Sequence, residues 1–275
     1  MLVFPNCKIN LGLRILNKRA DGYHDIETIF YPVPLKDAIE IIQTGNIDPV
    51  QFSSSGTVIS GDAADNLCIR AYLLLKKDFP KLPSVKIHLH KTIPMGAGLG
   101  GGSADAAFTL QLLNDQFQLN LSTSQLMGYA VKLGSDCPFF VLNQPCIGTG
   151  RGEILKKISL SLSGYQLLLV NPGIHINTRE AFLDLKIHGV NSHLVSLAEV
   201  VNKPLQCWPD SLKNDFEKPV FEKFPEIKEI KDILYKSGAS YAAMSGSGST
   251  VYGLFKKTIF PIKFAPGYFT RLLSL

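Results

Sequence analysis

The sequence predicts a folded protein in which strands and helices are mixed and the chain divides into two parts. Its 275 residues are 45% apolar and 19% charged, a balance typical of a chain that builds a hydrophobic core. Short alternating segments typical of strands are interspersed with segments of helical periodicity in both halves. A glycine-rich stretch at 146–153 separates the halves, so we expect one domain over residues 1–153 and a second over residues 154–275.

The first predicted element is an extended segment over residues 1–16. Its apolar face is formed by alternate residues, which are Cys7, Ile9, Leu11 and Leu13. Lys8 and Asn10 lie side by side on the opposite face. The alternation alone favours a solvated strand face for this pair, and a polar pair that lines a site is the alternative.

An aromatic residue and a histidine follow the next turn. Asp21-Gly22 predicts the turn, and Tyr23 and His24 come directly after it. A ring and an imidazole together could stack on a nucleobase and hydrogen-bond to it. A loop tyrosine and a solvated histidine are the simpler interpretation. Three further strands are expected at 26–30, 37–42 and 51–60.

The stretch around which the chain is organised is a glycine loop between a strand and a helix. Alternation predicts a strand over 85–91, and five glycines fall within 96–102. The helix that follows has Ser103 placed to cap it and Asp105 in its first turn. Such a helix start presents free N–H groups, and glycine lets a ligand approach the backbone closely. The loop therefore predicts a phosphate site.

Two familiar phosphate loops do not fit this stretch. A Walker A loop needs a lysine before its final hydroxyl residue, and here Gly102 precedes Ser103 directly. A G-x-G-x-x-G match also occurs within 96–101, but a dinucleotide fold requires a second strand about 20 residues further on. Residues 122–125 instead form a capping box that predicts another helix, through Leu133. A glycine turn without a ligand is the remaining alternative.

The predicted helix boundaries draw attention to one further carboxylate, Asp136. Asp65 or Asn66 is expected to cap a helix that runs through Lys77. Gly134 should end the helix that starts at the capping box, and Asp136 follows it just before a proline. Asp136 either caps a short helical turn or is a carboxylate held beside the glycine loop, and both interpretations stay open.

The second half is expected to hold a strand at 166–170, a helix that starts at Thr178 and another helix over about 219–237. Residues 242–255 predict two strands around a Gly-Ser turn. A plain hairpin explains that turn. A second glycine loop that faces the first across an interdomain cleft is the sharper alternative.

Composition excludes several classes of function. The net charge of +5 is spread along the chain, so we expect no nucleic acid as a partner. Five scattered cysteines with no C-x-x-C pair indicate neither a disulfide framework nor a zinc site. No apolar run reaches the ~20 residues that span a bilayer, and no leader pattern opens the chain. A cytoplasmic protein with no membrane partner is therefore expected.

Three motifs in one order resemble those of the GHMP kinase superfamily: residues 8–11, residues 94–107 and residues 244–249. Within the superfamily, Arg19-Ala20-Asp21-Gly22-Tyr23-His24 and residues 134–140 resemble the members that phosphorylate a cytidine-diphosphate derivative of methylerythritol. The resemblance covers nearly the whole chain. The Asp-Gly-Tyr-His stretch discriminates between members, because a small acceptor would give these rings nothing to stack on.

The resemblance implies an α+β protein, a two-domain GHMP kinase fold with the active site in the interdomain cleft. It implies ATP and Mg²⁺ as cofactors, small-molecule substrates, and a monomer or homodimer. The residues that it implies for ATP binding are Pro94, Met95, Gly96, Ala97, Gly98, Leu99, Gly100, Gly101, Gly102, Ser103 and Ala104, with Asn66, Leu67 and Lys91 near the base.

The same resemblance assigns the chemistry and the acceptor. Lys8 and Asp136 match the catalytic pair. The positions that match substrate contacts are Asn10, Tyr23, His24, Thr178 and Phe182. No metal ligands are implied with the same clarity, and Ser103 is a candidate contact. The chain departs from the common pattern at Ala104, where many relatives carry a second serine, and at Ser135 and Cys137, which flank Asp136.

Overall fold

The strands and helices of the chain fall into two units, neither of which is continuous in the sequence. In this computed structural model, which describes residues 1–45, 47–59, 61–62, 65–183, 185, 195–256 and 261–275, the first unit comprises Met1–Cys7, Leu35–Met95 and Gly100–Gln144. The second comprises Lys8–Pro34, Gly96–Leu99 and Pro145–Leu275. The predicted boundary between residues 153 and 154 lies inside the last stretch of unit 2.

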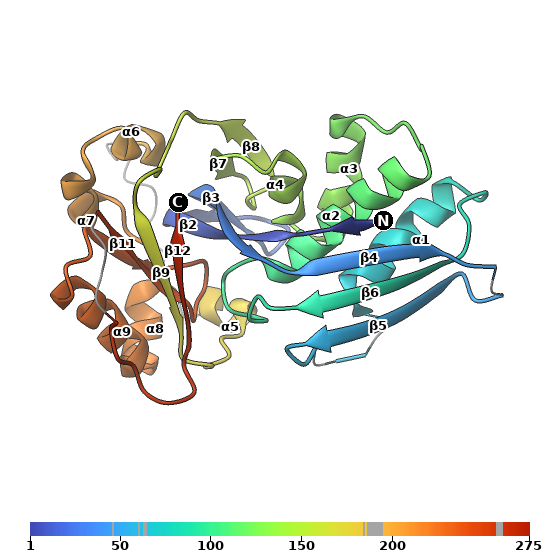
Figure 1. Cartoon of the computed structure of the whole chain (residues 1–275). Helices are drawn as coiled ribbons and strands as arrows, with labels where there is room; N and C mark the ends of the chain where they lie inside the picture. Colours follow the sequence, from blue (N-terminus) through green and yellow to red (C-terminus); the bar gives the residue numbers. More distant parts are fainter. Residues whose placement is uncertain (46, 60, 63–64, 184, 186–194, 257–260) are drawn as a thin grey trace. The chain divides into compact units, whose positions relative to one another are not determined.

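Unit 1 is built on a four-stranded sheet with helices against it. The strand order is β1-β4-β6-β5, with β4–β6 antiparallel and β5–β6 parallel. The strands are β1 (Leu2–Val3), β4 (Ala38–Gln43), β5 (Val50–Gly56) and β6 (Val85–Lys91). On β6 the apolar residues of the alternation are buried, which confirms the predicted strand. Figure 1 shows α1 (Leu67–Asp78) and α2 (Gly101–Gln116) on one side of this sheet.

The helix ends of unit 1 follow local capping chemistry. Asn66 caps α1, its side chain accepting a hydrogen bond from the Cys68 N–H. The capping box at Ser122 opens α3 (Thr123–Leu133), and Gly134 ends it. Helix α4 (Cys137–Leu142) follows with Asp136 at its N-cap position. These ends were predicted correctly because each depends on residues within one turn of the chain.

Unit 2 holds the other two sheets. One has the order β2-β3-β7-β8 and the other β10-β11-β9-β12. The first contains β2 (Asn6–Lys18), β3 (His24–Lys36), β7 (Cys146–Thr149) and β8 (Ile154–Lys157), and the second contains β9 (Gln166–Asn171), β10 (Tyr241–Met244), β11 (Val251–Phe255) and β12 (Phe269–Ser274). The predicted pair of strands around the Gly-Ser turn is thus confirmed as β10 and β11.

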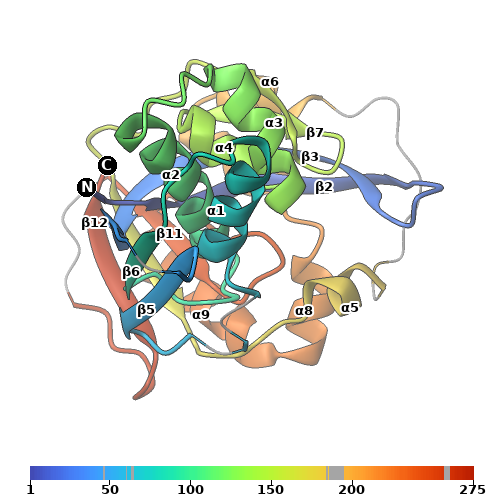
Figure 2. The ribbon, with the colours of Figure 1, turned by 90° about the vertical axis from the view of Figure 1, so that its right-hand side faces the viewer.

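The helices of unit 2 are short. They are α5 (Thr178–Leu183), α6 (Leu197–Val201), a 3₁₀ turn at Leu205–Cys207, α7 (Trp208–Ser211), α8 (Glu217–Lys223) and α9 (Pro225–Lys236). Helix α9 packs on β10 and β11, next to α8 (Figure 2). The single helix predicted over 219–237 is wrong: Phe224 leaves helical geometry at φ −132°, ψ 79°, because the proline that follows disfavours the helical region.

The structure also describes the apolar character of the helices and the state of the cysteines. Within the described ranges, no helix has the length and apolarity needed to cross a bilayer. The five cysteines are free thiols, four of them buried and Cys207 exposed.

Candidate active site

The helix that follows the glycine loop begins without a side-chain cap. Gly100 is its N-cap residue, in the left-handed conformation at φ 70°, and α2 starts at Gly101. The prediction that Ser103 caps this helix is therefore wrong, and Asp105 lies beyond the first turn. Because no described side chain caps the helix start through a hydrogen bond, its backbone N–H groups and positive dipole end are suited to an anion such as phosphate.

A pocket of unit 1 lies at this helix start. It has a volume of about 380 Å³, and its lining includes Phe52, Asn66, Leu67, Met95, Gly102 and Asp105. Apolar walls with a few polar groups are typical of a site for an aromatic ligand. The pocket therefore brings Asn66, Leu67 and part of the predicted ATP loop together within one unit.

Lys91, which was predicted to lie near the ATP base, has its ammonium group in a buried ion triad instead. Its Nζ atom contacts Asp37, and it lies 2.7 Å from Asp105 Oδ2. Asp37 also accepts hydrogen bonds from the backbone N–H groups of Thr92 and Ile93. The side chain of Lys91 thus ties β6 and the start of the loop to α2. A contact of Lys91 with ATP stays a prediction.

Asp105 is the incompletely bonded member of this triad. Its Oδ1 atom is buried and has no hydrogen-bond partner. Burial raises the pKa of Asp105 to about 7, against the opposing pull of the Lys91 ammonium. The triad therefore carries a carboxyl group that titrates near neutral pH.

Asp136 lies on a turn that contacts the start of α2 within unit 1. Its neighbour Cys137 is fully buried, which raises the pKa of that thiol to about 12, and a hydrogen bond with Ser103 partly offsets the rise. A Cβ on Gly134 would lie 3.3 Å from the Cys137 sulfur and 3.9 Å from Ser103 Oγ. The hydroxyl at the start of α2 and the turn that bears Asp136 are therefore close together.

Lys8 and Asn10 are buried, so the solvated strand face that the alternation favoured is wrong. They are 3% and 2% exposed. Lys8 Nζ donates to Asn10 Oδ1 at 2.5 Å and to the Gly98 carbonyl at 3.1 Å. The Asn10 amide donates to Thr28 Oγ1 at 2.9 Å. The alternative, a polar pair within a site, agrees with this burial, because groups removed from water need partners.

The Gly-Ser turn between β10 and β11 lies directly against the Gly96–Leu99 part of the glycine loop, within unit 2. The alternative in which this turn faces that part of the loop across an interdomain cleft is therefore wrong. Ser245 Oγ donates to the Gly98 carbonyl at 2.8 Å and accepts from the Asn10 N–H at 3.2 Å. The Thr250 N–H donates to the Ala97 carbonyl at 3.2 Å. The three motifs singled out in the sequence thus meet at Gly98.

His24 and Phe182 form a stacked pair. Their ring centroids are 4.8 Å apart with an interplanar angle of 8°. His24 is 9% exposed, contrary to the solvated histidine of the simpler interpretation. Burial, together with the nearby charge of Lys18, lowers the pKa of His24, so the neutral imidazole is favoured. In this structure the ring of Phe182 therefore stacks on His24, and its predicted contact with substrate stays a prediction.

Tyr23, the residue directly before His24, is exposed. Its side chain is 55% exposed, and the guanidinium of Arg151 lies over its ring with Cζ 4.8 Å from the centroid. Arg151 also approaches Glu153, at 3.6 Å from Nε to Oε1. The guanidinium is attracted to the ring face, so Arg151 positions the Tyr23 ring while more than half of the side chain stays exposed.

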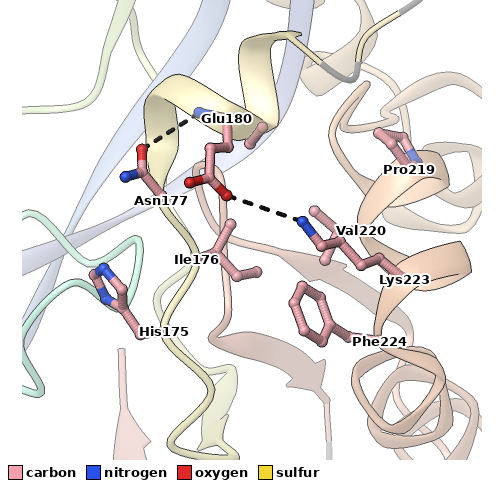
Figure 3. A pocket seen from close by; sticks show the side chains of 9 residues that line it. His175, Ile176, Asn177, Glu180, Pro219, Val220, Lys223 and Phe224 are labelled. Atoms are coloured by element: carbon pink, nitrogen blue, oxygen red, sulfur yellow. Dashed lines mark hydrogen bonds and ion pairs between the residues drawn. The ribbon is translucent and has the colours of Figure 1, made fainter.

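Thr178 is connected to the Gly-Ser turn through a hydrogen bond of 3.0 Å with Ser247. The pocket behind α5 is shown in Figure 3, where the Glu180 carboxylate points toward Lys223 at 3.9 Å. Its volume of about 40 Å³ admits a water molecule but no nucleobase. The substrate contacts predicted for Tyr23, His24 and Thr178 do not involve this pocket, and they stay predictions.

Comparison with known proteins identifies the family. Residues 66–144 match the family model described as GHMP kinases N terminal domain, and residues 197–259 match GHMP kinases C terminal. Over 258 residues the chain is 53% identical to the 4-diphosphocytidyl-2-C-methyl-D-erythritol kinase of Bacteroides thetaiotaomicron. The aligned residues make up 93% of this chain and 92% of the relative. The chain belongs to the GHMP kinase family.

Solved structures of GHMP kinases share its fold. A crystal structure of 4-(cytidine 5'-diphospho)-2C-methyl-D-erythritol kinase matches with a TM-score of 0.76 at 30% identity, over 92% of this chain and 90% of that one. Homoserine kinase from Cytophaga hutchinsonii matches with a TM-score of 0.72 at 14% identity, over 98% and 94%, a likeness of fold alone. The predicted α+β class is confirmed, and as a GHMP kinase the protein uses ATP.

Several residues of this GHMP kinase site were not among those predicted to bind or react. Ser245 lies in the third motif, yet its hydroxyl was given no role, and Arg151 was part of a glycine-rich stretch taken as a boundary. Asn214 and Glu217 hold the Gly-Ser turn from behind. The order of the family motifs pointed to Ser245, whereas no local pattern marked Asn214 or Glu217.

Proposed function

We propose that this GHMP kinase transfers the γ-phosphoryl group of ATP to the 2-hydroxyl of 4-diphosphocytidyl-2-C-methyl-D-erythritol, in the methylerythritol phosphate route to isoprenoids. Curated relatives about half identical over nearly the whole chain carry that activity in their name. The observation that carries the proposal on the acceptor side is the exposed ring of Tyr23, directly before His24, which stacks on Phe182. A small acceptor would give the exposed Tyr23 ring nothing to stack on.

The ATP side of the proposal rests on unit 1. The uncapped start of α2, with Gly100 before it, would bind the phosphates through backbone N–H groups. The pocket beside Asn66 and Leu67 would take the adenine. Ala104, where many relatives carry a second serine, is fully buried, so a hydroxyl at that position would need a hydrogen-bond partner inside the protein.

The acceptor side rests on unit 2. The exposed Tyr23 ring would stack on cytosine, while the neutral His24 imidazole would hydrogen-bond to its polar edge. Asn10 and Thr178 would contact the methylerythritol end. Both are already fixed, Asn10 by Thr28 and Thr178 by Ser247, so little side-chain freedom remains to be lost on binding.

Lys8 and Asp136 are proposed as the catalytic pair. Asp136 would accept the proton of the attacking hydroxyl, and Lys8 would stabilise negative charge on the nucleophile or the transferred phosphoryl group. Lys8 is held in place by Asn10 and the Gly98 carbonyl, so its ammonium group is positioned before substrate arrives. Such prior positioning lowers the cost of reaching the transition state.

A magnesium ion fits this chain as a partner of the nucleotide. Among the described residues, no three His, Cys, Asp or Glu side chains gather closely enough to bind a metal ion. Mg²⁺ commonly keeps water and phosphate oxygens as ligands and takes few from the protein. Ser103, at the start of α2, is the contact that the chain would offer. The ion would neutralise charge on the phosphates.

The test is ADP release by the purified protein with ATP, magnesium and one of three acceptors: the cytidine compound, homoserine or mevalonate. Release with the cytidine compound alone is the expected result. Release only with homoserine or mevalonate would keep the kinase chemistry and overturn the acceptor assignment. No release with any of the three would overturn the proposed activity. The cytoplasmic location and the monomer or homodimer stay predictions.

A further inference from the structure

Asn214 contacts both ends of the Gly-Ser turn from behind. Its side chain is buried, at 4% exposure. The two N–H groups of its amide donate to the carbonyls of Met244 and Gly246, each at 2.8 Å, and its Oδ1 atom accepts from the Phe216 N–H at 3.0 Å. Met244 and Gly246 are the two residues on either side of Ser245.

The residues that follow Asn214 extend the same support. Glu217 Oε1 accepts from the Met244 N–H at 2.9 Å, and its Oε2 lies 2.6 Å from Lys231 Nζ. Asp215 Oδ2 accepts from the Ile15 N–H at 2.7 Å, on the strand that carries Lys8. Three side chains of one tetrapeptide therefore hold backbone groups of the third motif and of β2, the strand that carries Lys8.

Ser245 connects the supported turn to Lys8, the proposed catalytic residue. Its hydroxyl donates to the Gly98 carbonyl, and the same carbonyl accepts from Lys8 Nζ. A shift of Ser245 would therefore move the oxygen that holds the Lys8 ammonium. Misplacement of a reacting group by about 1 Å costs on the order of 10²-fold in rate.

We propose that Asn214 is a positioning residue for phosphoryl transfer: by holding the carbonyls on both sides of Ser245, it fixes the Gly98 carbonyl and with it Lys8. This inference rests on the proposed function for its kinetic test. It differs from a purely structural role, because it ties one buried amide to turnover rather than to stability alone.

The experiment compares Asn214→Ala and Asn214→Asp with Tyr235→Phe. Tyr235 donates to the Ala242 carbonyl in the same sheet, so Tyr235→Phe removes a hydrogen bond to that sheet without touching the turn. The unfolding midpoint of each variant is measured first. The turnover number and both Michaelis constants are then measured at a temperature well below the lowest of these midpoints. Asn214→Asp keeps the size of the side chain and the oxygen that accepts from the Phe216 N–H, and it removes the amide that donates to Met244 and Gly246. This variant tests the positioning role if the alanine variant does not fold.

Both Asn214 variants are expected to lose about 10–100-fold in kcat, while Tyr235→Phe stays within about twofold of the wild type. Addition of Ser245→Ala to Asn214→Asp should cost little more than either change alone, because both act through one route. Folded Asn214 variants with kcat near that of Tyr235→Phe, or additive losses, would overturn the inference. If the wild type releases ADP only with another acceptor, the acceptor assignment fails, and the same comparison is made with that acceptor.

Discussion

The backbone of Gly98 lies against that of Ser245 with no room for a side chain. A Cβ built on Gly98 would stand 2.0 Å from the Ser245 carbonyl oxygen, and Gly98 has φ +76°. Both the close approach and the left-handed backbone require glycine here. The contact brings the predicted phosphate loop to the strand that carries Lys8.

Gly98→Ala is therefore expected to lower the unfolding midpoint, since a left-handed alanine alone costs about 1–2 kcal/mol. Because the added Cβ would also displace the Ser245 carbonyl, kcat/KM for ATP should fall by about tenfold or more. The matched control is Gly173→Ala. Gly173 has φ +78° but nothing within 4 Å of a Cβ, so it carries the backbone strain without the collision. Equal losses in the two variants would contradict the importance of the contact with Ser245.

Asp136→Asn tests the proposed general base. Because general-base help is worth about 10²–10⁴-fold, we expect kcat to fall by that factor while the Michaelis constant for ATP is retained. Asp115→Asn, a change at an exposed position of α2, serves as the control. Near-normal turnover of Asp136→Asn would remove this carboxylate from the mechanism.

Tyr23→Ala tests the nucleobase contact. Base stacking on an aromatic ring is worth about 1–3 kcal/mol, so the Michaelis constant for the cytidine compound should rise by about fivefold or more, and that for ATP should not change. Tyr23→Phe keeps the ring and should stay near the wild type. A rise confined to ATP would show that the base assignment is wrong.

Asp105→Asn tests the buried triad through pH. The pKa of Asp105 is raised from 3.8 to about 7, so between these values the folded state holds a proton that the unfolded state has released. The contribution of this group to stability therefore falls as pH rises from about 4 to about 7. Relative to the wild type, Asp105→Asn should gain in urea midpoint over that window. A constant difference at pH 4.5, 5.5 and 6.5 would contradict the raised pKa.

The parts predicted well from the sequence are those governed by neighbours in the chain. Asn66 and Ser122 cap their helices through groups two and three residues away, and Gly134 ends α3. Pro225 is an instance where a local rule was available and was not applied, since a proline in the middle of a predicted helix favours a break before it.

The parts that were missed depend on partners far along the chain. Lys8 and Asn10 are buried because Gly98 and Ser245 lie over them, and strand alternation carries no information on such contacts. Lys91 pairs with Asp37, 54 residues away. Asn214 and Glu217 act on the turn at 244–246, about 30 residues further on. Only the family motifs, taken together, raised Lys8 and Asn10 above their simpler interpretation.

The discontinuous make-up of the units sets an order of assembly during synthesis. All residues of unit 1 lie within the first 144, whereas residues 8–34 belong to unit 2 and bond to residues as far on as Tyr252, whose hydroxyl donates to the Asn10 carbonyl. At about 5–20 residues per second, the ribosome needs roughly 10 s to add the remaining 130 or so residues. The strand that bears Lys8 must therefore wait for its partners while unit 1 can already form, and interactions this distant in sequence make folding slow.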